Sequence, residues 1–157
     1  TPPSRDPIEP SGAKSMRKRC RRTVRREAAP TLVAYYLNPE VSTQERMSVV
    51  ALRGGYATTS HFDVLADCRD MLALAAAEKN DEQTLIVCEI GLVALENIKA
   101  RYLERHRIGA TGDELQALQA LVDVSEDFWK RQSGGLFIDA EAALSKARAE
   151  FRERKTA

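Results

Sequence analysis

Carboxylates recur at helical spacing in two stretches of the chain, and this pattern is the most suggestive of chemistry. Residues three or four apart on a helix share one face. Paired carboxylates on one face can transfer protons or hold Mg²⁺. Such spacing more often marks a solvated acidic face, and we expect a face of this kind that binds a protein partner. Its residues are Asp63, Asp67 and Asp70 in one stretch and Asp123, Glu126 and Asp127 in the other.

The histidines and cysteines lack the spacing of a metal site or an activated nucleophile. The chain has two histidines, His61 and His106, and contains neither a CxxC nor an HExxH motif. A structural zinc site needs about four ligands, usually in close pairs. Cys20 stands among arginines, which lower the pKa of a thiol, whereas Cys68 and Cys88 fall on apolar helical positions and are expected in the core. We therefore predict no metal, no cofactor and no catalytic site, and thus a protein that is not an enzyme.

A basic arm precedes the rest of the chain. Between residues 14 and 26, eight lysines and arginines occur without a carboxylate, which leaves 16 basic and 23 acidic residues elsewhere. Clustered arginine suits phosphate groups, and the lack of aromatic residues within the arm favours contact with a nucleic-acid backbone over stacking on bases. The predicted nucleic-acid contacts are Lys14, Arg17, Lys18, Arg19, Arg21, Arg22, Arg25 and Arg26.

Two other interpretations of the arm stay open. It can lie on the carboxylate faces of its own body or of a second subunit, or it can be a solvated tail. The body itself shows no phosphate-binding motif, because the glycine pair in RGGYATT (Arg53–Thr59) lacks the P-loop pattern GxxxxGK[ST]. The helix expected after this turn carries Asp63 and Asp67 in its first turns, and these carboxylates would repel DNA. A DNA-reading helix-turn-helix is therefore not expected.

Proline divides the chain into two parts. All six prolines fall in the first 39 residues, and proline interrupts helices. We predict that residues 1–41 form an extended leader with the basic arm and an apolar latch, TLVAYYLNP, and that residues 42–157 form an all-α bundle of about five helices.

Capping signals place the helices of this bundle. Capping boxes are predicted at Ser42–Glu45 and Thr111–Glu114, where a hydroxyl and a carboxylate each accept from a backbone N–H group. Another helix is expected to begin within residues 58–60 and to end near residue 79, and Asp81 is expected to cap the next, which ends near residue 106. We expect Ser133-Gly134-Gly135 to end the fourth helix, and a fifth to carry an apolar stripe from Ala140 to Phe151.

The third predicted helix is apolar around most of its circumference. Its centre reads LIVCEIGLVAL, too short and too polar for a membrane span. A helix of this kind lies inside a bundle or in a subunit interface, so we predict a homo-oligomer and expect Phe128, Trp129 and Phe151 to add to its apolar surface. Gly91 is expected to allow the close approach of another helix, and Trp129 to be buried. The unpaired cysteines favour a cytoplasmic location.

The stretches GGYATTSHFDVLADCRDMLALAAAEKND and IGATGDELQALQALVDVSEDFWKRQSG resemble a group of small helical proteins encoded by proteobacterial phages and plasmids. The resemblance covers the helical body and implies a mobile-element setting, but it carries no functional residue. We expect an accessory or regulatory protein that contacts nucleic acid through its arm and a protein partner through its body. The alternative is an inhibitor or adaptor with an acidic helical face and no affinity for nucleic acid.

Overall fold

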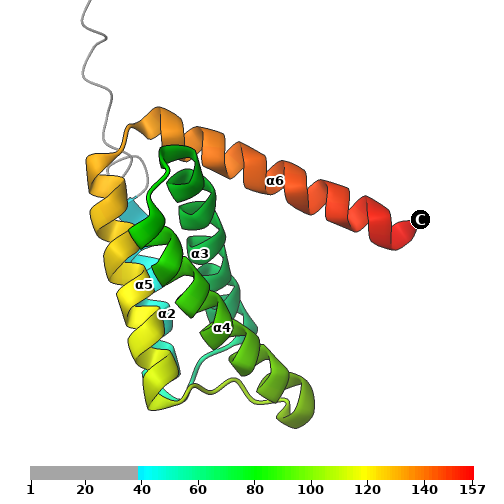
Figure 1. Ribbon diagram of the computed structural model, residues 1–157. Helices are drawn as coiled ribbons and strands as arrows, with labels where there is room; N and C mark the ends of the chain where they lie inside the picture. Colours follow the sequence, from blue (N-terminus) through cyan, green and yellow to red (C-terminus); the bar gives the residue numbers. More distant parts are fainter. Residues whose placement is uncertain (1–38) are drawn as a thin grey trace, which may run out of the picture.

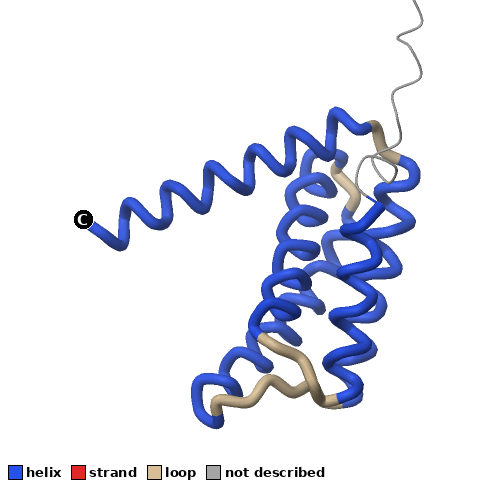
Figure 2. Tube along the Cα trace, turned by 180° about the vertical axis from the view of Figure 1, so that it is seen from behind, coloured by secondary structure: helices blue, strands red, loops and turns tan. Residues whose placement is uncertain are grey.

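The computed structural model describes residues 39–157 and confirms the predicted all-α class (Figure 1). Five helices follow one another with short connections, seen from behind in Figure 2. The predicted leader, basic arm and most of the apolar latch lie outside the described residues. None of the described helices is long and apolar enough to span a bilayer. The helices are α2 (Pro39–Gly54), α3 (Thr59–Lys79), α4 (Glu82–Arg105), α5 (Gly112–Arg131) and α6 (Gly134–Thr156).

Helices α2 to α5 form a four-helix bundle, and α6 projects from one end of it (Figure 1). Helix α3 contacts each of the other four helices, so it is the central element of the domain. The short loops between α2, α3, α4 and α5 make consecutive helices of the bundle antiparallel neighbours.

Local capping explains most of the helix boundaries. The backbone N–H of Thr84 donates to the Asp81 carboxylate at 3.1 Å, and the backbone N–H of Thr111 donates to the Glu114 carboxylate at 2.8 Å. Both predicted caps are therefore confirmed. At the start of α3 the Thr58 N–H donates to Nδ1 of His61 at 3.0 Å, so this histidine serves a helix terminus. His106, with φ of 52°, forms the left-handed cap at the end of α4.

The predicted start of the first helix is wrong. Helix α2 begins at Pro39, so Ser42 lies within the helix and Glu45 is a buried residue one turn further on. Proline suits the first position of a helix because its φ is already helical and the missing N–H would have no partner there. The Asn-Pro pair therefore precedes a helix here, where the sequence was interpreted as a turn that closes the latch.

The predicted role of the glycine pair near residue 134 is also wrong. Helix α5 ends at Arg131, and Gly134 and Gly135 are the first residues of α6. The Ser133 hydroxyl accepts a hydrogen bond from the Leu136 N–H and caps α6. Only the first turns of α6 pack on the bundle: Leu136 and Ala140 are buried, whereas Phe151 is 60% exposed.

The core lies between α2, α3, α4 and α5. Its largest fully buried side chains include Leu65, Leu72, Ile98, Leu118, Leu121 and Phe128. Trp129, Cys68 and Cys88 are buried as predicted. Because Phe128 and Trp129 are both buried, they do not form the exposed apolar surface that the sequence suggested.

Gly91 allows α4 and α5 to approach each other closely, as predicted. A Cβ atom at this position would lie 3.1 Å from Cδ2 of Leu121 on α5, tighter than ordinary van der Waals contact. The missing side chain therefore sets the distance between these two helices.

Candidate functional site

The six predicted acidic-face residues lie on α3 and α5, and four of their carboxylates form ion pairs with arginine. Asp67 pairs with Arg148 of α6, and Asp70 pairs with Arg69 at 3.0 Å. Asp123 and Glu126 both pair with Arg46 of α2. Asp63 and Asp127 are exposed. Three of these four carboxylates are thus paired with arginines from other helices of the same chain.

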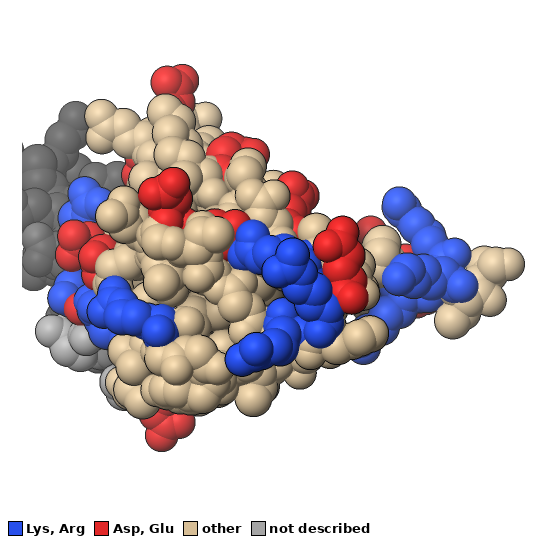
Figure 3. Space-filling model, turned by 90° about the horizontal axis from the view of Figure 1, so that it is seen from below, with Lys and Arg blue, Asp and Glu red and all other residues tan. Residues whose placement is uncertain are grey.

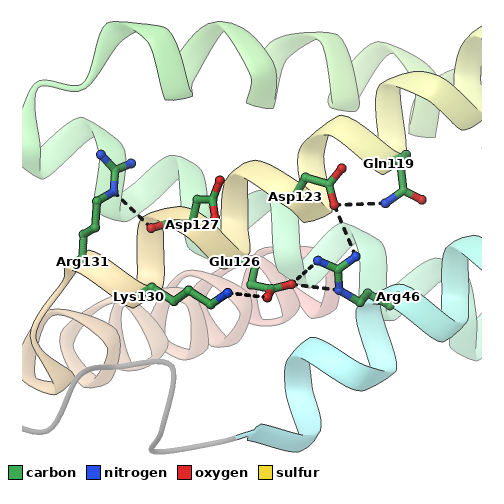
Figure 4. Close-up of polar contacts among 7 residues, drawn as sticks. All are labelled: Arg46, Gln119, Asp123, Glu126, Asp127, Lys130 and Arg131. Carbon is green, nitrogen blue, oxygen red and sulfur yellow. Dashed lines mark hydrogen bonds and ion pairs between the residues drawn. The ribbon is translucent and has the colours of Figure 1, made fainter.

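Arg46 links α2 to α5 through two carboxylates (Figure 4). Its Nε donates to Glu126 at 2.8 Å, and its Nη1 donates to Asp123 at 3.3 Å. Lys130 donates to the other oxygen of Glu126 at 2.7 Å. Hydrogen bonds from Lys130 and Arg46 lower the pKa of Glu126, so this carboxylate is charged at neutral pH.

A cavity of about 240 Å³ lies between α2, α3, α5 and α6, where α6 leaves the bundle. Its apolar walls include Val41, Val64, Met71, Trp129, Phe137 and Leu144. The ion-paired residues Asp67, Arg148 and Glu126 also line it. Two predicted acidic-face residues, one from α3 and one from α5, are therefore brought together at this cavity.

Three buried polar side chains face one another at this cavity: Glu45 of α2, Cys68 of α3 and Ser125 of α5. Burial raises the pKa of the Glu45 carboxyl group to about 7, although a hydrogen bond from the Cys68 thiol acts in the opposite direction. Ser125 is 1% exposed, and its hydroxyl meets the Cys68 thiol but has no hydrogen-bond partner of normal geometry within residues 39–157. Buried polar groups normally have partners, so this cavity holds unused hydrogen-bonding capacity.

The cavity is better suited to binding than to thiol chemistry. Cys68 is 3% exposed, and burial raises the pKa of its thiol well above the ordinary value. The neutral thiol is a poor nucleophile. Both histidines stand at helix ends, His61 as a cap of α3 and His106 at the end of α4. Within residues 39–157, no three His, Cys, Asp or Glu side chains are grouped so that they could hold a metal ion.

A second notable surface is the outer face of α4. Ile86, Ile90 and Val93 follow one another at spacings of four and three residues and are 60%, 54% and 56% exposed. Exposed glutamates accompany this aliphatic row at seven-residue intervals, at Glu82, Glu89 and Glu96. The opposite face of α4 carries Cys88, Gly91 and Ile98, which are buried. The described helices thus cover one side of the apolar circumference of α4 and leave the other side exposed.

The distal part of α6, residues 146–156, has a net positive charge, from five basic residues and two glutamates. Its last turns extend beyond the bundle, and Figure 3 shows lysine and arginine side chains at this projecting end. Ala147 and Phe151 are exposed there and continue the stripe of Leu136 and Ala140 beyond the end of the core. The basic residues of this part are Lys146, Arg148, Arg152, Arg154 and Lys155.

Glu45 was missed as a candidate site residue because it was assigned to a capping box. A signal for its burial was present, since Glu45, Val49 and Leu52 share one helical face at spacings of four and three residues. The eight predicted nucleic-acid contacts of the basic arm lie outside the described residues. No protein-family model, curated protein or solved structure matches the chain.

Proposed function

We propose that the protein is a non-enzymatic accessory protein whose helical body binds a protein, and whose basic arm (residues 14–26) contacts a nucleic-acid backbone. The observation that carries this proposal is the exposed aliphatic row on α4. Complete burial of a Val or Ile side chain contributes about 1.5–3 kcal/mol, so covering three half-exposed side chains is a substantial driving force. Exposed aliphatic residues that form one row at helical spacing fit the apolar face of a second helix.

The partner of this row is a second copy of the chain, which contributes its α6. The projecting part of α6 offers Ala147 and Phe151 between basic residues, and a line of glutamates runs along one side of the aliphatic row on α4. The two surfaces are therefore complementary in both polarity and charge. A short helix without tertiary support is marginal in water, so α6 also gains stability from this contact. In a twofold dimer each copy gives α6 and receives α6.

Dimer formation supports the role of the arm. Two arms on one particle bind phosphate groups with a higher effective concentration than one arm does. Residues 39–157 contain 15 basic and 20 acidic residues, so the helical body has a net negative charge and repels nucleic acid. The contacts with phosphate groups are therefore made by the arm.

Light scattering of the full chain tests self-association. We expect a dimer mass at high micromolar concentration, and a monomer mass for Ile90→Glu, which places a charge within the aliphatic row. Val50→Glu is the matched control, because Val50 on α2 is also exposed, at 44%, but lies outside the row. A monomeric wild-type protein at these concentrations would refute the dimer.

Charge reversal identifies the partner helix. Glu96→Lys on α4 and Arg154→Glu on α6 should each weaken the dimer, and the double variant should recover part of the loss. If each single variant weakens the dimer and the double variant shows no recovery, α6 is not what covers α4.

Salt dependence and deletion of residues 1–26 test the arm. If the arm binds phosphates, the slope of log K against log salt should be roughly −3 to −6, since each neutralised phosphate of B-DNA contributes about −0.9. Affinity should not depend on base sequence, and the deletion should abolish binding while leaving helicity unchanged. Retention of nucleic-acid binding by the truncated protein would refute this part of the proposal.

The alternative, an acidic-face inhibitor, is weakened by the ion pairs of Asp67, Asp70, Asp123 and Glu126, which leave little free negative charge on α3 and α5. Capture of partners from a host lysate, with and without nuclease, distinguishes the two. A stoichiometric partner that survives nuclease treatment and is lost in Asp63→Asn/Asp127→Asn favours the inhibitor.

A further inference from the structure

The cavity between α2, α3, α5 and α6 has an excess of negative charge. Among the described residues, four carboxylates line it, from Glu45, Asp67, Glu126 and Glu141, against the single guanidinium of Arg148. Asp67 pairs with Arg148, and Glu126 pairs with Arg46 and Lys130. Among residues 39–157 neither Glu45 nor Glu141 has a lysine or arginine within ion-pair distance. A bound cation would supply the missing positive charge.

The polar atoms of the cavity also lack partners. The Glu45 residue is 6% exposed, and among residues 39–157 the hydrogen-bond donor to its carboxyl group is the weakly donating Cys68 thiol. The Ser125 hydroxyl of α5 is fully buried and meets the Cys68 thiol, but it has no partner of normal geometry within the described residues. A carboxylate can accept several hydrogen bonds, so the group that satisfies Glu45 is a donor with several N–H bonds.

The walls of the cavity specify the rest of the ligand. Trp129 and Phe137 both line it, with ring centroids 5.1 Å apart and planes at 78° to each other. Aromatic rings attract cations through their faces and pack against apolar groups. A cavity of about 150 Å³ is sufficient for benzene, so the volume of about 240 Å³ here accommodates an aromatic ring with a short side chain.

From these three features we propose that the cavity is a binding site for a small organic cation, a protonated primary amine on an aromatic or aliphatic body. The ammonium group donates to the Glu45 carboxylate, and the body packs on Trp129 and Phe137. This site is separate from the aliphatic row on α4, so the proposal does not depend on the proposed dimer.

The acid–base properties of the cavity add a distinctive pH dependence. Only ionised Glu45 pairs with an ammonium group, and with a pKa of about 7 its ionised fraction is about tenfold larger at pH 8 than at pH 6. Affinity for an amine should therefore fall about tenfold when the pH is lowered from 8 to 6, and binding near pH 7 should release protons. The groups that face Glu45 or line the cavity with it are Arg46 on its own helix, Cys68 and Asp67 on α3, Glu126 on α5, and Glu141 and Arg148 on α6.

Calorimetric titration of the full chain with 2-phenylethylamine tests the proposal. Two controls share its aromatic body: 2-phenylethanol, which has no charge, and 3-phenylpropanoate, which has the opposite charge. We expect saturable one-to-one binding of the amine, at least tenfold weaker binding of the alcohol and no binding of the carboxylate. Equal binding of amine and alcohol, or no binding of the amine at millimolar concentration, would overturn the proposal.

Variants locate the site. Glu45→Gln should weaken amine binding at least tenfold at pH 8 and remove its pH dependence, whereas Glu153→Gln on the exposed end of α6 should change neither. Val64→Phe, which fills the cavity from α3 and keeps Glu45, should abolish binding while far-ultraviolet circular dichroism remains helical. If Glu45→Gln does not fold, the amine affinity of Val64→Phe is the measurement that tests the site. Unchanged amine affinity in Val64→Phe would show that the amine binds elsewhere and would refute this site. Ile90→Glu, designed to disrupt the proposed dimer, should keep full amine affinity.

Discussion

Replacing Glu45 by glutamine should change how the stability of the protein depends on pH. The carboxyl group is buried, and its pKa is raised from the ordinary value of 4.5 to about 7. Between these two pH values the folded protein holds a proton that the unfolded chain has released. Folding stability therefore falls as pH rises through this interval, and it is constant with respect to this group above about pH 8.

The magnitude follows from the size of the pKa shift. An upward shift from 4.5 to about 7 corresponds to about 3 kcal/mol, at about 1.36 kcal/mol for each pH unit. Glutamine has nearly the same shape and does not titrate, so the stability of the variant does not fall in this way as the pH rises. The stability of Glu45→Gln minus that of the wild type should therefore rise by about 3 kcal/mol between pH 4.5 and pH 8. This change is roughly 10 °C in Tm for a domain of this size.

Thermal and urea unfolding of the two proteins at a series of pH values measures this difference. Glu114 and Glu126 have lowered pKa values, so their contributions are lost as pH falls, but both proteins contain them and they cancel in the comparison. A buried glutamine also leaves its amide without partners, which lowers the stability of the variant by the same amount at every pH. The slope of the stability difference against pH is therefore unchanged. Glu104→Gln, an exposed site on α4, is the control. A difference that stays flat from pH 4.5 to pH 8 would refute the reasoning about Glu45.

Three further predictions concern packing and ion pairs. Gly91→Val should destabilise the protein by about 1–3 kcal/mol in urea unfolding, because the added methyl groups meet Leu121, whereas Gly91→Ala should cost less since alanine favours helix. Iodide should quench the native fluorescence of Trp129 only weakly because the residue is 7% exposed, and quenching as strong as in urea would contradict the burial. Arg101→Ala should cost about 1–2 kcal/mol because Arg101 donates to both Glu114 and the Gly109 carbonyl at 2.9 Å, and an unchanged urea midpoint would show that this link is unimportant.

Local signals in the sequence were sufficient for most of the helices. The caps at Asp81 and Thr111 act between residues three positions apart, so their hydrogen bonds can be inferred without knowing the fold. Gly91 and Trp129 could also be interpreted correctly, because a glycine in an apolar helix and an aromatic residue on an apolar stripe have few stable environments. The start of α2 could not be decided in this way, because Asn-Pro can end one element or begin a helix at Pro39.

The tertiary structure alone decided which polar residues meet. Asp67 and Glu126 were inferred to belong to acidic helical faces, but their partners, Arg148 and Arg46, come from distant parts of the chain. The pKa of Glu45 depends on burial by three other helices, and the exposure of Ile90 depends on no described helix covering the outer face of α4. Hydrogen bonds along one helix are set by the order of residues, whereas burial and ion pairing depend on the distances between helices, which arise only when the bundle packs.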